Sequence, residues 1–180
     1  MLQKMMGRIV RVVKLDATVY EEIEHDESAN VEAAIIVAVA SLLTALGSAI
    51  GVWTTGGRFG AGIGSFFISL ILGVALNWLL WSYVTMLVGT KLFGGEATFS
   101  EMARTLGYAN APRVLGILGA FTCLGAVIGI VAWVLSLIAG FFAVREALDL
   151  PTDKSIITII IGWVIVLIVT VVLGSVVALF

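Results

Sequence analysis

Residues 94–112 read GGEATFSEMARTLGYANAP and form the most organised polar stretch of a strongly apolar chain. Gly94 and Gly95 predict the end of one helix, because glycine reaches the left-handed backbone region at little cost. Thr98 and Glu101 have the spacing of a capping box, which predicts that the next helix begins at this point. Pro112 predicts the start of a further helix, since proline fits the first helical turn.

The helix predicted after Thr98 is amphipathic, and we expect it to lie on the cytoplasmic surface of a membrane. Its apolar residues recur at helical spacing on one face: Phe99, Met102, Ala103 and Leu106. The polar residues of this stretch, together with Pro112 and the following Arg113, form a candidate patch for a protein partner or lipid headgroups: Glu96, Glu101, Arg104, Tyr108, Asn110, Pro112 and Arg113. Helix capping and marking of the membrane boundary would explain the same residues, and the sequence leaves both interpretations open.

The composition on either side of this stretch indicates a membrane protein. Hydrophobic residues make up 61% of the 180 and charged residues only 12%. A chain of this length cannot bury so much apolar surface in its own core, so a lipid bilayer is the expected solvent. The net charge of −2 argues against a nucleic-acid partner. A single cysteine excludes an intrachain disulfide and a thiolate metal cluster.

Charge-free runs predict the membrane spans of an all-α protein. Two runs give spans at about residues 33–53 and 64–88, and the last run gives a span at about 156–179. The run between Arg113 and Arg145 is ambiguous. It fits one long tilted helix, for four spans in total, or two short helices at 112–124 and 126–144, for five.

The distribution of Lys and Arg favours five spans, because these residues collect on the cytoplasmic side of a membrane. With the N-terminus inside, five spans divide the ten basic residues nine to one, and Arg58 alone lies outside. With four spans, Arg145 and Lys154 lie outside as well, and the ten basic residues divide seven to three. We therefore expect five spans, with the N-terminus in the cytoplasm and the C-terminus outside.

Residues 1–31 form a separate N-terminal segment ahead of the membrane domain at 32–180. Its first part predicts an amphipathic helix with a basic face, formed by Lys4, Arg8, Arg11 and Lys14. Such a helix suits an anionic membrane surface and its lipid headgroups, or it packs against loops of the same protein; the sequence leaves both open. The acidic stretch YEEIEHDESANVE (20–32) is interpreted as a segment kept in water by its charge.

Apart from Arg113, which marks the boundary of the span at 112–124, the predicted spans contain no Asp, Glu, Lys, Arg or His, which argues against a proton relay, a metal site and a pore for charged solutes. Asn77 is the polar exception and is a candidate intramembrane contact. It belongs to a stripe of small and polar residues that fits a solute-facing groove or a contact between helices. The stripe consists of Ser65, Ser69, Gly73, Asn77, Trp81 and Thr85.

Glycine pairs four residues apart allow close helix approach, within one chain or in a homo-oligomer. The pairs are Gly47/Gly51, Gly60/Gly64 and Gly125/Gly129. Cys123 has no base among the spans to activate it, so it is interpreted as a packing residue. We expect no catalytic residues, no metal and no cofactor.

The order of these features resembles the Yip family, the Ypt/Rab-interacting membrane proteins, in its short prokaryotic form. The most specific part is the sequence of Gly-Gly, Ser/Thr-x-x-Glu, Leu-Gly-Tyr-Ala and Pro within residues 94–112, and WVLSLIAGFFAVREAL (133–148) supports it. The resemblance covers nearly the whole chain. It implies five spans, a cytosolic N-terminus and a place in a prokaryotic cytoplasmic membrane.

The resemblance also implies a non-enzymatic protein, and in eukaryotic relatives the binding of prenylated Rab GTPases in vesicle traffic or membrane shaping. We therefore expect an integral membrane scaffold or interaction protein, active in membrane organisation or trafficking-like processes, or an accessory subunit of a membrane complex. Its partners would be the bilayer and an unidentified membrane or cytoplasmic protein. The alternative is a small transporter or lipid-handling protein, with Asn77 on the path.

Overall fold

The computed structural model describes residues 2–54, 56, 58–114 and 125–177, and every regular element within these ranges is helical. The N-terminal segment forms two short helices, α1 (Leu2–Val13) and α2 (Thr18–Glu24). The remaining elements are α3 (Ala29–Thr54), α4 (Phe59–Ile71), η1 (Leu72–Leu80), α5 (Trp81–Phe93), α6 (Phe99–Ala109), α7 (Gly125–Ala147) and α8 (Thr152–Val177). The predicted all-α membrane fold is confirmed.

Three of the described helices are long and apolar enough to cross a membrane, over residues 29–47 of α3, 127–147 of α7 and 152–172 of α8. The predicted span 64–88 lies within a helical run over residues 59–93, which passes from α4 through η1 into α5. The predicted span 112–124 lies mostly outside the described residues; 111–114 form a single 3-10 turn. The count of five spans stays a prediction.

The run from α4 to α5 contains a π-helical segment, η1, whose wider turn changes which way the following side chains face. Gly73 in η1 packs toward Ser41 of α3, whereas Thr85 in α5 packs toward Gly162 of α8. Members of the predicted small-and-polar stripe therefore make contacts with two different helices, which supports the interpretation as helix packing. The side chain of Asn77 lies outside the described part of the chain.

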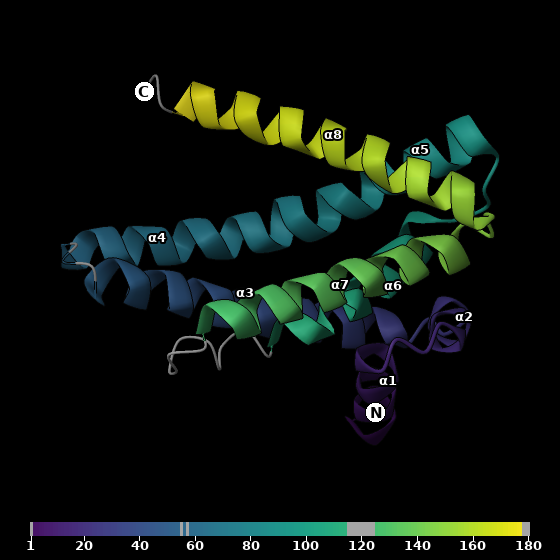
Figure 1. Cartoon of the computed structure of the whole chain (residues 1–180), viewed down its shortest axis with the longest axis horizontal. Helices are drawn as coiled ribbons and strands as arrows, with labels where there is room; N and C mark the ends of the chain where they lie inside the picture. Colours follow the sequence, from purple (N-terminus) through teal and green to yellow (C-terminus); the bar gives the residue numbers. More distant parts are fainter. Residues whose placement is uncertain (1, 55, 57, 115–124, 178–180) are drawn as a thin grey trace.

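Helix α6 lies inside the bundle rather than on an open membrane surface, so that prediction is wrong. It packs against α3, α5 and α7, and α2 also contacts it (Figure 1). All residues from Met102 to Ala109 are buried. The physical reason lies in two small residues, Ala103 and Gly107, which leave room for neighbouring helices to approach α6 closely.

The local signals that begin α6 are confirmed. Gly94 ends α5 with a φ of 72° in the left-handed region. Thr98 accepts a hydrogen bond from the Glu101 backbone nitrogen at 3.3 Å, and the Glu101 carboxylate accepts one from the Thr98 nitrogen at 2.7 Å. The loop also contacts the α7–α8 connection, because the Glu96 nitrogen donates to the Leu148 carbonyl at 3.2 Å.

Four members of the predicted glycine pairs make no close contact within the described chain, and the surroundings of Gly51 and Gly125 lie outside the described part. A Cβ atom added at Gly47, Gly60, Gly64 or Gly129 would meet nothing within 4 Å. Close approach occurs instead at a different set of glycines: Gly62, Gly73, Gly89, Gly95 and Gly107. The pairs therefore stay candidates for contacts between copies of the chain.

Candidate functional site

The N-terminal cap, defined as residues 2–28 with α1 and α2, is folded onto the membrane helices. Helix α1 runs across the direction of α3, α7 and α8 (Figure 1). It buries Met5, Arg8 and Val12, while Val19, Tyr20 and Ile23 of the following segment are fully buried. Of the two interpretations of this helix, packing against the same protein is the one observed.

Arg8 is the centre of the contact between the cap and α3. Its side chain is only 2% exposed and lies between three carboxylates. The Nη1 group donates to Glu32 Oε2 at 3.1 Å, and the Nη2 group donates to Asp26 Oδ2 at 2.7 Å. The Nε group donates to Glu22 Oε1 at 3.0 Å. Each of the three guanidinium nitrogens thus donates a hydrogen bond to a carboxylate, as the planar arrangement of its donors allows.

Tyr108 connects this charged cluster to α6. Its hydroxyl donates a hydrogen bond to Glu32, the same carboxylate that binds Arg8. Glu32 is 1% exposed and Tyr108 is fully buried. A buried carboxylate needs such partners, because an unpaired one is costly in a low-dielectric interior. Glu32 therefore joins α1, α3 and α6 at one point.

The outer basic residues of α1 are also paired. Lys4 lies 2.6 Å from Asp26, and Arg11 contacts both Asp16 and Glu22 at 2.8 Å. The hydrogen bonds from Lys4, Ser28 and Arg8 hold the pKa of Asp26 well below its usual range. The bond from Arg11 likewise lowers the pKa of Asp16.

The acidic stretch 20–32 therefore does more than keep this part in water, and that interpretation is corrected. Glu22, Asp26 and Glu32 were missed as functional candidates, although they neutralise the basic face of α1. The signal available in the sequence was the pair of apolar residues Tyr20 and Ile23 within the acidic run. Their helical spacing indicates a packed face rather than a fully solvated segment.

Arg104 is a second buried cation beneath the cap. It is 5% exposed, and its Nη2 group donates to the backbone carbonyl of Glu24. Its Nη1 group donates to Ser100 Oγ at 3.3 Å, and Ser100 in turn donates to Asn30 Oδ1 at 3.0 Å. Arg104 thus connects α6 to α2 from inside the protein.

The predicted contact residues do not form one surface. Arg8, Arg104, Tyr108 and Pro112 are buried, which removes them from direct contact with a partner. Lys4, Lys14 and Glu96 are exposed, and Glu101 and Arg11 are partly exposed. Asn110 and Arg113 are partly exposed and line a separate cavity between helices.

The exposed apolar side chains of α1 form the clearest free surface of the cap. Leu2, Met6 and Val10 follow one another at helical spacing and are 71%, 51% and 48% exposed. The basic residues Lys4, Arg8 and Arg11 lie on the opposite side of the helix and are paired with acidic groups of the cap. The stripe therefore faces outward on a helix whose orientation is fixed from the other side.

Within the described ranges, no three metal-binding side chains come together. The arrangement of long apolar helices beneath a charged, folded cap defines the chain as a multi-pass integral membrane protein. Residues 16–174 match the Yip1 domain, and the chain belongs to this family. The resemblance seen in residues 94–112 is thereby confirmed. The chain has no significant match to a curated protein or to a solved structure.

Proposed function

We propose that the chain is a non-enzymatic interaction protein of the membrane, with five spans and a cytoplasmic N-terminal cap. In this function the cap presents the stripe of Leu2, Met6 and Val10 to a second protein in membrane organisation or in a larger membrane complex. The observation that carries the proposal is the burial of Arg8 among three carboxylates. It ties α1 to the membrane domain.

A fixed cap favours binding because a preorganised surface loses less conformational entropy when a partner associates. Single exposed apolar residues are ordinary, but three in register on one helix form a continuous patch. The charge pairs keep α1 in place without using the stripe. The stripe thus stays available while the helix stays ordered.

The proposal is tested by replacing Met6 with a photo-crosslinking phenylalanine analogue in cells that express the full chain. We expect irradiation to give one protein adduct of defined mass, which mass spectrometry identifies. The matched control carries the analogue at Glu21, an exposed position of α2 away from the stripe. We expect no such adduct there. Adducts to lipid alone at position 6, or none, would refute the protein-binding role.

A second variant connects the adduct to the orientation of the cap. Asp26→Asn removes the carboxylate that pairs with Lys4 and Arg8. We expect this variant to insert into the membrane normally but to form less adduct at position 6. An unchanged adduct would show that the fixed cap is unnecessary for binding.

A further inference from the structure

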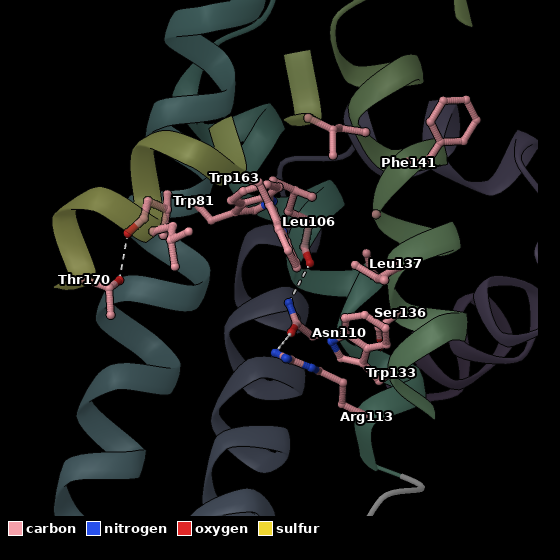
Figure 2. A pocket seen from close by; sticks show the side chains of 15 residues that line it. Trp81, Leu106, Asn110, Arg113, Trp133, Ser136, Leu137, Phe141, Trp163 and Thr170 are labelled. Atoms are coloured by element: carbon pink, nitrogen blue, oxygen red, sulfur yellow. Dashed lines mark hydrogen bonds between the residues drawn. The ribbon is translucent and has the colours of Figure 1, made fainter. Parts of the chain in front are cut away.

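A cavity of about 300 Å³ lies between α5, α6, α7 and α8, away from the N-terminal cap. Figure 2 shows its walls, with Trp133 and Leu137 from α7, Trp163 from α8 and Trp81 from α5. Helices α7 and α8 diverge from the loop that joins them (Figure 1). The cavity thus lies along two of the candidate membrane spans, 127–147 and 152–172.

Arg113 contributes the charge of this cavity. It lies on the same wall as Trp133 and Ser136, which are near the middle of α7 (Figure 2). Arg113 therefore lies beside residues of the candidate span 127–147, and the interpretation that it marks the membrane boundary stays a prediction. An arginine beside an apolar span is costly unless it has a partner, and such residues usually serve a function.

The partners of Arg113 inside the chain are few. Its Nη1 group donates to Asn110 Oδ1 at 3.2 Å. Among the described residues no carboxylate pairs with it, whereas the two buried arginines of the described chain, Arg8 and Arg104, each have at least one acidic contact. All acidic side chains of the sequence belong to the described ranges. Arg113 therefore has no acidic side chain of the protein as a partner, which leaves its charge available to an anion from outside the chain.

A second polar side chain in the wall of the same cavity is that of Ser136. Ser136 Oγ is buried and meets no hydrogen-bond partner among the described residues. Apart from Asn110 and Thr170, the rest of the wall is mainly apolar, and two residues of α8 in it are at least half exposed, Trp163 at 50% and Leu167 at 61%. The cavity therefore offers one cationic end and one long apolar side.

The geometry points to a binding site for an anionic phospholipid, with its phosphate on Arg113 and Ser136 and its acyl chains along α7 and α8. Arg binds phosphate through two parallel hydrogen bonds. A volume of about 300 Å³ suits the polar part of such a lipid, while the chains extend past the exposed Trp163 and Leu167. The inference goes beyond the interaction function, because the site does not involve the cap.

The test is native mass spectrometry of the full chain after reconstitution with equal amounts of phosphatidylglycerol and phosphatidylcholine that carry the same acyl chains. We expect the protein to retain phosphatidylglycerol about tenfold over phosphatidylcholine, because the choline cation of the latter opposes the attraction of its phosphate to Arg113. Arg113→Gln should abolish this preference. Lys91→Gln removes an exposed cation at the end of α5 and should leave it unchanged.

A pair of glycine substitutions tests the apolar part. A Cβ atom at Gly140 or at Gly129 would meet nothing within 4 Å, but only Gly140 lines the cavity. We expect Gly140→Leu to fill the site and to lower total lipid retention several-fold, and Gly129→Leu to have no effect.

Three results would overturn the site: equal retention of both lipids by the unaltered chain, an unchanged preference in Arg113→Gln, or release of phosphatidylglycerol by millimolar inorganic phosphate. The last would identify a free-anion site instead. None of these results affects the photo-crosslink at Met6, so failure here and failure of the interaction function are distinguishable.

Discussion

Gly107 of α6 packs directly against Ala33 of α3, so closely that a Cβ atom at Gly107 would lie 2.6 Å from the Ala33 Cβ. This approach places the next residue, Tyr108, within hydrogen-bonding reach of Glu32, one residue before Ala33. The Gly-Tyr pair of the family motif thus has a physical meaning. The glycine lets two helices meet, and the tyrosine satisfies the acid where they meet.

Gly107→Val should destabilise the protein by about 1–3 kcal/mol, because the added atoms overpack the contact with Ala33. The measurement is the midpoint of thermal unfolding in detergent, followed by size-exclusion chromatography. Gly129→Val is the matched control, since the space at that glycine is open. Equal midpoints for the two variants would show that α3 and α6 can move apart at this contact without loss of stability.

Tyr108→Phe should cost about 1.5–3 kcal/mol, because it removes a hydrogen bond to a charged and buried carboxylate. The same thermal assay measures this loss. Tyr83→Phe is the control, because Tyr83 is 49% exposed and its ring contact with Phe99 is retained in phenylalanine. A loss at Tyr108 no larger than that at Tyr83 would contradict the described role of Glu32.

Arg8→Gln should be far more harmful than Lys4→Gln, although both residues are basic and contact Asp26. Removal of Arg8 leaves the buried Glu32 without its cation, which costs about 3–5 kcal/mol. Lys4 is 54% exposed, so its pair contributes about 0–1 kcal/mol. The measurement is limited proteolysis of the cap, with faster cleavage expected only for Arg8→Gln.

The double variant Arg8→Gln/Glu32→Gln checks this explanation. It removes the unpaired charge as well as the cation, so we expect it to recover part of the lost resistance to protease. A double variant as sensitive as Arg8→Gln alone would show that the loss arises from packing rather than from charge.

The stability of the cap should fall as the pH rises from about 5 to 8. Burial, together with the charges of Asp149 and Glu101, raises the pKa of Glu24 from 4.5 to about 7. The positive charges of His25 and Arg104 lower this pKa, but by less than the other groups raise it. The folded state holds a proton that the unfolded state has already released, so its stability declines through this window. The thermal midpoint measured across the pH series reports this decline.

Glu24→Gln should flatten that dependence and raise the midpoint at pH 8. His25 adds a smaller decline that remains in the variant, because the bond to the Glu21 carbonyl raises its pKa. Glu27→Gln changes an exposed carboxylate of the same segment and should behave like the unaltered chain. Identical pH profiles for all three proteins would rule out Glu24 as the cause.

Cysteine labelling from one side of the membrane should decide between five and four spans. We expect Lys14→Cys and Lys154→Cys to react from the cytoplasmic side and Arg58→Cys from the other. The enrichment of Lys and Arg on the cytoplasmic side of membranes predicts this pattern. If Lys154→Cys reacts together with Arg58→Cys, the chain has four spans. Cys123 is replaced by serine in all variants.

The helices, the capping box at Thr98 and the left-handed Gly94 follow from the sequence, because neighbouring residues along the chain produce them. The same local pattern sufficed to recognise the family. The membrane location also follows from the sequence, because the free energy of exposing long apolar runs to water depends on their composition.

The tertiary structure decided which charges meet. Arg8 and Glu32 are 24 residues apart, and Tyr108 lies 76 residues beyond Glu32. No periodicity relates such positions, and a basic helix face looks the same whether it faces lipid headgroups or buried acids. Only the packing of α6 against α3 places Tyr108 beside Glu32, and only the divergence of α7 and α8 leaves a cavity beside Arg113. Such contacts depend on the positions of whole helices, which the local sequence does not specify.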